Sequence, residues 1–260
     1  MHHILLLVTV LMILGTGTVQ ANINAPYAVD ANTIALYHFD EATGGVTPDA
    51  VGNHPGTLNG NAAMVPGGKF ANGLGLDGSG DYVRLGNVHQ NPAQSTAQGT
   101  VEAWVKLEAA PNSFVVLGSG TEYGNCWDDG WFLGRHSQYS SNLVFMIWSG
   151  GWQVADSGIA PESLVGGWHH LAGTWGAEGV QVWVDGVLQA TNPAYTAGLS
   201  NTNYQTALVG ADSWTWCTPG MVDEVRISDI QRDLAVPLPG TVWLLGSALL
   251  GVAGWRCRKG

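Results

Sequence analysis

Positively charged residues are scarce in this sequence. Lys and Arg number 9 against 20 Asp and Glu, and all charged residues together make up 11% of the 260 residues. Every acidic residue lies between Asp30 and Asp233, where six basic residues oppose the 20 acids, so this region carries 6 − 20 = −14 with His neutral. Such a surface repels phosphate backbones, which argues against a nucleic-acid partner. It suits cations, neutral sugars or simple solubility.

The sequence also lacks helical periodicity. Gly is abundant, at 37 residues, and short runs of alternating apolar and polar residues are separated by Gly, Asn and Asp. This pattern is typical of antiparallel strands joined by tight turns. There is no Pro/Ser-rich linker and no internal repeat, so about 200 residues between the two termini predict a single all-β domain, a sandwich or a barrel.

The clearest strand pattern runs from Gly167 to Thr191, GWHHLAGTWGAEGVQVWVDGVLQAT. Two alternating segments are followed by Asp185-Gly186, a pair that favours a type I′ hairpin turn. His169 and His170 are adjacent on a strand, so they point to opposite faces and cannot chelate one metal together. We expect one to pack beside Trp and the other to be exposed.

Residues 100–107 form a second clear strand. Its alternation divides the side chains into a core face of Val101, Ala103, Val105 and Leu107 and an outer face of Thr100, Glu102, Trp104 and Lys106. An outer face of this kind is often a binding groove in a curved sheet. Further strands are expected at 33–39, 113–119, 131–136, 142–148, 152–156, 205–210 and 221–227, with 69–76 and 81–85 forming a hairpin. That makes about a dozen strands; residues 22–32 are expected to be a loose lead-in, and 49–60 a loop.

Several of these stretches together resemble one family, the laminin-G-like, concanavalin A-like jelly roll. In order they are IALYHFDEATGG (34–45), DAVGNHPGTLNG (49–60), GLDGSGDYVRL (75–85) with TVEAWVKL (100–107), the 167–191 segment, and MVDEVRI (221–227). The resemblance implies a two-sheet antiparallel jelly-roll domain over 32–233, whose closing strand pairs next to the first. It is specific for the fold, which hosts lectins, adhesion modules and glycosidases alike.

Both ends of the chain resemble export signals. Residues 1–21 resemble a secretory signal peptide, with an apolar stretch from Ile4 to Leu14 and a small-x-small cleavage site, Val19-Gln20-Ala21. The alternative is an N-terminal anchor that stays uncleaved. We favour cleavage because the apolar run is short for a membrane span.

Residues 236–260 read VPLPGTVWLLGSALLGVAGWRCRKG, an apolar span from Thr241 to Trp255 with a cationic end. They resemble the PEP-CTERM sorting signal in its VPLP form, without the Glu of the eponymous tripeptide. The resemblance implies a transmembrane helix lodged briefly in the inner membrane of a Gram-negative bacterium, with its basic end in the cytoplasm. An exosortase would then cut near the Pro motif and pass the protein to the cell surface or matrix. An ordinary C-terminal anchor is the alternative.

Three cysteines are present, and Cys257 belongs to the tail. Cys126 and Cys217 both lie in Trp-rich stretches, NCWDDGW and SWTWCTPG. In an oxidising compartment they predict a Cys126–Cys217 disulfide, with two free thiols as the alternative.

Such a disulfide would gather aromatic residues into one place. It would bring Trp127 and Trp131 near Trp214 and Trp216, with Asp128 positioned to take sugar hydroxyls, and Trp148 and Trp152 near by. Flat aromatic faces among a few polar groups are typical of a carbohydrate site. The alternative is that these tryptophans cover the disulfide and fill the loops.

A structural calcium ion is the one cofactor that the resemblance suggests. Jelly rolls of this kind often carry calcium near their first and last strands, and Asp40 and Asp223 occupy those positions. Asp49 and Asn53 lie in a loop that could close over them, and oxygen ligands suit Ca²⁺. Alternatively, Asp40 and Asp223 cap turns or pair with Arg226.

Catalytic motifs are missing. There is no G-x-S-x-G, no Cys–His pair in a suitable setting and no P-loop. Glycosidases need two carboxylates across a groove, and the Glu-x-Asp-x-x-Glu-like run of the jelly-roll glucanases is absent. We therefore expect a secreted, surface-sorted, non-catalytic module that binds polysaccharide. A structural or adhesive protein that binds other proteins is the alternative, and a polysaccharide-degrading enzyme is the third.

Overall fold

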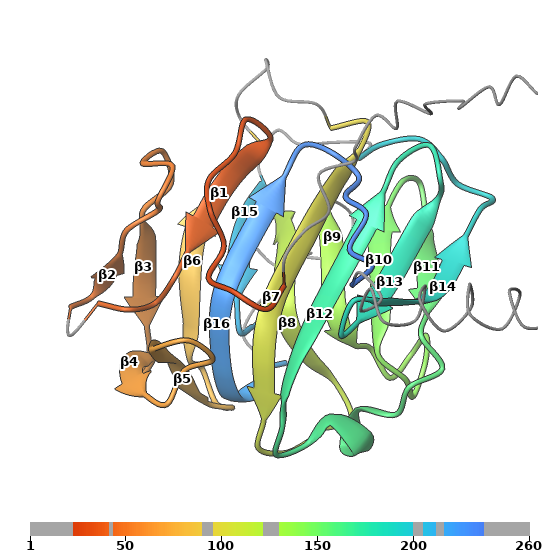
Figure 1. The fold of residues 1–260 in the computed structure, drawn as a ribbon. Coiled ribbons are helices and arrows are strands. Elements are labelled where there is room, and N and C mark those ends of the chain that lie inside the picture. The colour runs from red at the N-terminus through yellow and green to blue at the C-terminus, as the bar shows by residue number, and fades with distance from the viewer. Residues whose placement is uncertain are drawn as a thin grey trace, which may run out of the picture.

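The protein is described by a computed structural model that covers residues 23–41, 44–89, 96–121, 130–199, 205–211 and 216–236. Across these residues, strands form two antiparallel sheets that pack face to face (Figure 1). The helical structure found there is a single turn, η1 (Pro161–Leu164). The predicted two-sheet all-β sandwich is confirmed.

One sheet, here called sheet A, carries the first and last strands of the domain. It consists of β1 (Thr33–Tyr37), β4 (Ala63–Pro66), β5 (Asn72–Asp77), β7 (Gly99–Leu107), β12 (Trp168–Trp175), β13 (Val180–Val184), β14 (Val187–Asn192) and β16 (Pro219–Ser228). The strand order is β14-β13-β12-β7-β16-β5-β4, and β1 pairs with β16. The expected pairing of the closing strand with the first strand is therefore present.

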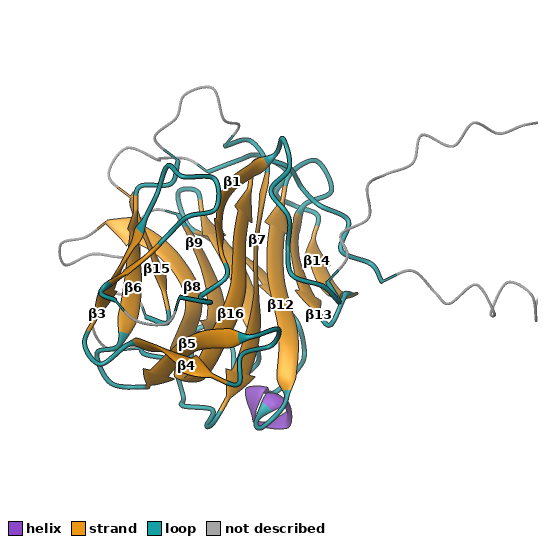
Figure 2. Ribbon diagram, turned by 60° about the vertical axis from the view of Figure 1, so that its left-hand side comes forward, coloured by secondary structure: helices purple, strands orange, loops and turns teal. Residues whose placement is uncertain are grey.

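The other sheet, sheet B, consists of β2 (Val46–Thr47), β3 (Gly56–Asn59), β6 (Tyr82–Gly86), β8 (Phe114–Thr121), β9 (Trp131–Arg135), β10 (Val144–Trp148), β11 (Trp152–Asp156) and β15 (Gln205–Val209). Its order is β11-β10-β9-β8-β15-β6-β3-β2. Figure 2 shows the two layers from the side, with η1 at one end of the sandwich. Strand β3 lies within residues 49–60, which the sequence predicted to be a loop, and β2 lies just before them.

The hairpin predicted at Asp185-Gly186 is confirmed. Both residues have positive φ, 52° and 72°, as a type I′ turn requires. The turn joins β13 to β14, which forms the edge of sheet A.

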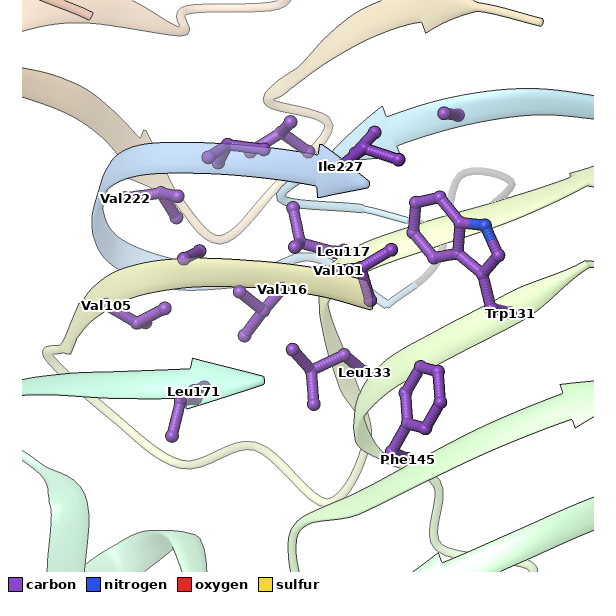
Figure 3. Close-up of a cluster of buried hydrophobic side chains, with 14 of the residues drawn as sticks. Val101, Val105, Val116, Leu117, Trp131, Leu133, Phe145, Leu171, Val222 and Ile227 are labelled. Atoms are coloured by element: carbon purple, nitrogen blue, oxygen red, sulfur yellow. The ribbon is translucent and has the colours of Figure 1, made fainter. Parts of the chain in front are cut away.

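The core lies between the sheets. On β7, Val101, Ala103, Val105 and Leu107 are all at most 2% exposed, which confirms the predicted core face. Figure 3 shows Val101 and Val105 facing Leu117 and Leu133 of sheet B, with Trp131 and Phe145 in the same cluster. Burial of this contiguous apolar set is the main stabilising term of the fold.

The hairpin predicted from 69–76 and 81–85 is wrong. Strand β5 pairs with β4 and β16 in sheet A, whereas β6 pairs with β3 and β15 in sheet B. The chain crosses between sheets at 78–81, where the buried carboxylate of Asp81 accepts a hydrogen bond from the Asp77 N–H at 3.0 Å. Local alternation predicts strands but does not say which sheet each one joins.

The outer face of β7 is covered and forms no groove, which corrects the sequence prediction. Thr100, Glu102 and Trp104 are at most 4% exposed. Two terminal segments lie over this side of sheet A, the N-terminal strap (23–32) and the C-terminal strap (229–236), drawn red and blue in Figure 1. Neither strap has its own strand pattern, so this cover could not be predicted from local patterns.

The N-terminal strap is held firmly, contrary to the loose lead-in expected from the sequence. Ile23 and Tyr27 are 3% and 5% exposed. The carbonyl of Ile23 accepts a hydrogen bond from Trp104 Nε1 at 3.0 Å, and the Tyr27 N–H donates to Glu224 Oε2 at 2.7 Å.

The C-terminal strap runs along β12 and β13 toward the Asp185-Gly186 turn. Leu234 is fully buried against Ala172 and Trp183, and the Val236 N–H donates to the Gly186 carbonyl at 3.4 Å. Within the residues that the structure covers, no helix is long and apolar enough to cross a membrane. The predicted signal peptide and the tail beyond Val236 lie outside those residues.

Candidate functional site

Five tryptophan and aspartate residues were predicted to bind a ligand, and the structure describes two of them. Trp127, Asp128 and Trp214 lie outside the described residues, as does Cys126. Trp131 and Trp216 are described, and they lie on opposite sides of sheet B.

Trp131 belongs to the core between the sheets. It is 1% exposed, and its Nε1 donates to His89 Nε2 at 3.0 Å (Figure 3). Burial lowers the pKa of His89 to about 4, so this imidazole stays neutral and can accept that hydrogen bond. A ring enclosed in this way has no face left for a sugar, so the alternative reading, structural Trp, is the correct one for Trp131.

Trp216 lies on the outer face of sheet B, at the end where β8 begins. Its carbonyl accepts a hydrogen bond from the Val115 N–H at 3.2 Å. Its ring meets His136 edge-on at 4.5 Å between centroids and packs against the cluster of Val115, Phe132, Val144 and Met146. Trp216 is half-buried, so part of its surface is accessible.

Trp148 and Trp152 form a second aromatic group at the opposite end of the same outer face. They are directly paired across β10 and β11, with ring centroids 5.5 Å apart at 76°, and both are half-buried. The Trp148 N–H donates to the Gly130 carbonyl at 2.9 Å. This Trp148–Trp152 surface therefore adjoins the point where residues 122–129 join β9.

Alternation along β10 and β11 was the signal that could have found this surface. Phe145 and Ala155 point into the core, so Trp148 and Trp152 must point outward. The sequence reasoning placed both only as neighbours of a disulfide-linked loop. Their position on an outer face follows from the strands themselves and needs no disulfide.

The predicted Cys126–Cys217 disulfide stays a prediction. Cys217 is 5% exposed and its Sγ accepts a hydrogen bond from the Gly80 N–H at 3.2 Å. It lies beside Val115, at the start of β8, because Thr218 Oγ1 donates to the Val115 carbonyl. Gly130 instead lies against Ser119, four residues further along β8. Four strand residues span about 13 Å. The four residues from Gly130 to Cys126 reach at most about 14 Å, and a disulfide joins Cα atoms about 5.5 Å apart, so the bridge is within reach.

Asp49 organises the turn that follows it. Its Oδ1 accepts hydrogen bonds from the N–H groups of Leu36 and Val51, and its Oδ2 accepts those of Asn53 and His54, all at 2.9–3.1 Å. A carboxylate surrounded by four N–H donors is poorly placed to bind a cation. The side chain of Asn53 is exposed on the same turn.

Asp40 and Asp223 both hold the turn that precedes β5. Asp40 Oδ1 accepts a hydrogen bond from the Asn72 N–H at 3.2 Å, and Asp223 Oδ2 accepts those of Lys69 and Phe70 at 2.7 and 3.3 Å. Burial and the charge of Glu224 raise the pKa of Asp223 to about 7, against the three N–H groups that lower it. These contacts match the turn-capping alternative.

Three of the four predicted calcium ligands, Asp40, Asp49 and Asp223, therefore already accept backbone N–H groups. Across the residues that the structure describes, no three His, Cys, Asp or Glu side chains are grouped so that they could hold a metal ion. Asp223 does not pair with Arg226, whose guanidinium instead bonds Glu102. Calcium remains a prediction that a melting experiment can test.

Glu102 is the centre of a buried ionic network beneath the N-terminal strap. Its Oε1 accepts the Arg226 Nε–H at 2.8 Å, and its Oε2 lies 3.0 Å from His170 Nε2. Burial by itself would raise the pKa of Glu102, but the Arg226 charge and the His170 hydrogen bond lower it to about 2. His170 is fully buried beside Trp104, as expected for one of the two adjacent histidines.

The other adjacent histidine, His169, is partly exposed and lies 2.8 Å from Asp185 Oδ2. A similar pair joins His38 to Glu224, with Nδ1 2.7 Å from Oε1. The hydrogen bond to Glu224 raises the pKa of His38. Glu224 is 1% exposed and also accepts the Tyr27 N–H, so it holds the N-terminal strap on sheet A.

The family model for the concanavalin A-like lectin/glucanases superfamily matches residues 77–235, more than half of the chain. The chain belongs to this superfamily. A second model, the PEP-CTERM protein-sorting motif, matches residues 235–259. The motif implies exosortase processing and export to the surface or exterior of a Gram-negative bacterium. A search among curated proteins finds no match.

Several solved structures share the fold. Domain 4 of a GH43 extracellular arabinanase from Geobacillus stearothermophilus, solved in complex with arabinotriose, is 22% identical with a TM-score of 0.62. The alignment covers 80% of this chain and 100% of that domain. The receptor binding domain of botulinum neurotoxin C/D mosaic serotype is 16% identical, with a TM-score of 0.57 and coverage of 79% and 50%. Trypanosoma rangeli sialidase is 16% identical, with a TM-score of 0.55 and coverage of 79% and 32%. At these identities the likeness extends to the fold alone.

Proposed function

We propose that this protein is an exported, non-catalytic module that binds polysaccharide outside the cell. The observation that carries the proposal is the Trp148–Trp152 surface, two half-buried indole rings on the outer face of sheet B. Indole faces stack on the apolar face of a pyranose or furanose ring, and a large flat side chain offers this contact at little cost in entropy.

Polar partners for the sugar hydroxyls come from the adjoining loop in this proposal. Residues 122–129 join β9 next to Trp148 and contain Trp127 and Asp128. Trp216, at the other end of the same outer face, would contact more distant units of a long chain. Trp131 has no part in the site because it is in the core.

The Geobacillus domain supports a binding role. That domain was solved in complex with arabinotriose, and its whole length aligns with this chain. It is one domain of a larger enzyme, which is consistent with a fold that holds a sugar without cleaving it. The sugar bound by this protein need not be the same.

A non-catalytic role is favoured by the state of the buried carboxylates. Glu102 is fully buried and Glu224 is 1% exposed. Both are engaged with Arg, His and backbone partners under the N-terminal strap. A glycosidase needs a pair of acids open to the substrate, and these two are covered.

The test is retention of the protein by polysaccharides, including exopolysaccharide of the producing organism. Losing one aromatic contact costs about 1 kcal/mol, so a double variant Trp148→Ala, Trp152→Ala should weaken retention about tenfold or more. Trp168→Ala is the matched control, because Trp168 is also half-buried but lies on sheet A. Circular dichroism checks that all variants fold.

Three results would overturn the proposal. Equal loss of retention in the Trp168→Ala control would remove the assigned site. Release of new reducing or unsaturated ends would identify an enzyme. Self-association or protein partners without retention by any glycan would identify a structural or adhesive protein.

A further inference from the structure

Exposed apolar residues gather at the end of the sandwich where the chain leaves the domain. Val187, Leu188 and Val236 are 57%, 41% and 38% exposed. Val187 and Leu188 begin β14 directly after Gly186, and the Val236 N–H donates to the Gly186 carbonyl. We call these three residues the exit patch. Scattered exposed apolar residues are ordinary, but a gathered set marks a contact with a protein or a membrane.

A fourth exposed apolar residue, Val165, lies at the same end. It is 42% exposed and forms a bridge with Leu107, the last residue of β7. The Asp185 N–H donates to the His170 carbonyl near the start of β12, which places the exit patch at this end too.

The sequence beyond Val236 indicates that this end of the sandwich faces a membrane. Residues 237–240 separate Val236 from the apolar run 241–255, which is followed by Arg256, Arg258 and Lys259. The step from Val236 to Thr241 spans at most about 18 Å when fully extended. Because Leu234 is buried on sheet A, the strap cannot lengthen this tether without breaking its contacts. A tail lodged in a bilayer therefore holds the Gly186 turn close to the bilayer surface.

We propose that the exit patch rests on the periplasmic surface of the inner membrane while the tail is lodged there. This rests on the sorting route of the proposed function. We infer that lipid covers the exit patch, because the short segment 237–240 keeps the patch next to the bilayer. Val187 and Leu188 point to opposite faces of β14, so the turn end of this strand lies at the interface.

The same arrangement directs the Trp148–Trp152 surface away from the membrane. Trp148 follows Ile147, which pairs with Trp131 across β9 and β10. The His89 ring packs edge-on against both Trp131 and Trp175. Trp175 pairs with Gly99, at the opposite end of β7 from Leu107. The aromatic surface and the exit patch thus lie at opposite ends of the sandwich and on different sheets. A glycan can be engaged before the protein is released.

The experiment uses chain 22–260 in vesicles of phosphatidylethanolamine and phosphatidylglycerol. A photo-cross-linking phenylalanine replaces Val187 in one variant and Val46 in the other. Val46 is the matched control, because it is 55% exposed and lies on β2, at the far edge of sheet B. We expect at least tenfold more lipid adduct at position 187 than at position 46.

Equal or absent lipid adducts at 187, or protein–protein adducts there, would overturn the inference. Flotation with the vesicles is scored first: a chain that does not float shows that the tail does not lodge, and the inference falls with it. Glycan retention by the tail-free domain is measured separately. Its loss defeats the proposed function alone, whereas adducts at both positions defeat the exit patch alone.

Discussion

The Arg232 guanidinium donates one hydrogen bond to each carboxylate oxygen of Asp30, both of 2.8 Å, although the two residues are 202 positions apart in the chain. Its Nε also donates to Ser228 Oγ at 2.8 Å. This contact fastens the N-terminal strap to the C-terminal strap, so the two ends of the domain lie side by side on sheet A. Trp104 packs against Ile23 and Tyr27, so its cover depends on the N-terminal strap that this contact fastens.

Replacing Arg232 with Ala should lower the free energy of unfolding by about 1–3 kcal/mol, since charge-assisted hydrogen bonds of this kind are lost. Arg232→Lys should recover only part of the loss, because an ammonium cannot bond both oxygens at once. Urea denaturation measures both. Wild-type stability in Arg232→Ala would show that the straps are not joined in solution.

The contribution of this pair should depend on pH. Arg232 holds the pKa of Asp30 well below its usual range, so the stabilisation is complete above about pH 4 and is lost as the pH falls below that value. The difference between wild type and Arg232→Ala should therefore shrink in acid. A difference that is constant from pH 7 to pH 3 would contradict this assignment.

Glu102→Gln should destabilise the protein by about 3 kcal/mol at neutral pH, because Arg226 keeps its charge in a buried place without a partner. The folded-state pKa of Glu102 is lowered from 4.5 to about 2. Its contribution is therefore present above about pH 4.5 and fades as the pH falls toward 2. Thermal unfolding between pH 7 and pH 2 measures this. Glu108→Gln, at an exposed site, is the control and should change little.

Gly186→Ala tests the contact between the Asp185-Gly186 turn and the C-terminal strap. Gly186 has φ of 72°, and an added Cβ would lie 2.3 Å from Val236 Cγ2 and 3.0 Å from the Leu234 carbonyl oxygen. Gly86→Ala is a matched control, since Gly86 also has φ of 72° but no atom within 4 Å of an added Cβ. In both variants, backbone strain should lower the free energy of unfolding by about 1 kcal/mol. Only Gly186→Ala should also increase proteolysis at 229–236, and equal cleavage of the two variants would count against the contact.

Calcium removal separates a bound ion from turn capping. Because Asp49 and Asp223 already accept backbone N–H groups, we expect EGTA to leave the melting temperature of the purified domain unchanged. A fall that added CaCl₂ reverses would establish calcium as a structural ligand after all.

The Cys126–Cys217 disulfide is tested by non-reducing peptide mapping of protein recovered from the periplasm. A cross-linked pair of peptides would confirm it. Two separately alkylated peptides would establish the thiol alternative, and the Trp148–Trp152 surface would stand without it.

The sequence alone determined most of the strands, the all-β class, the Asp185-Gly186 turn and the sorting motif. These features have local causes. Side chains alternate along a strand, and few residue pairs adopt positive φ at both positions. The sorting motif is visible as an apolar run followed by basic residues. The core face of β7 was predicted for the same reason, because its apolar residues alternate strictly.

Only the tertiary structure decided which outer faces are covered and which sheet each strand joins. Alternation gives a strand two faces but does not say what will lie over the second one. Glu102 is buried, and Tyr27, far from it in the sequence, packs on its partners His170 and Arg226. Trp131 and Trp148 are equally apolar in sequence, yet one fills the core and the other forms the proposed sugar surface. The register of their strands makes that choice, because it sets which residues face the opposite sheet.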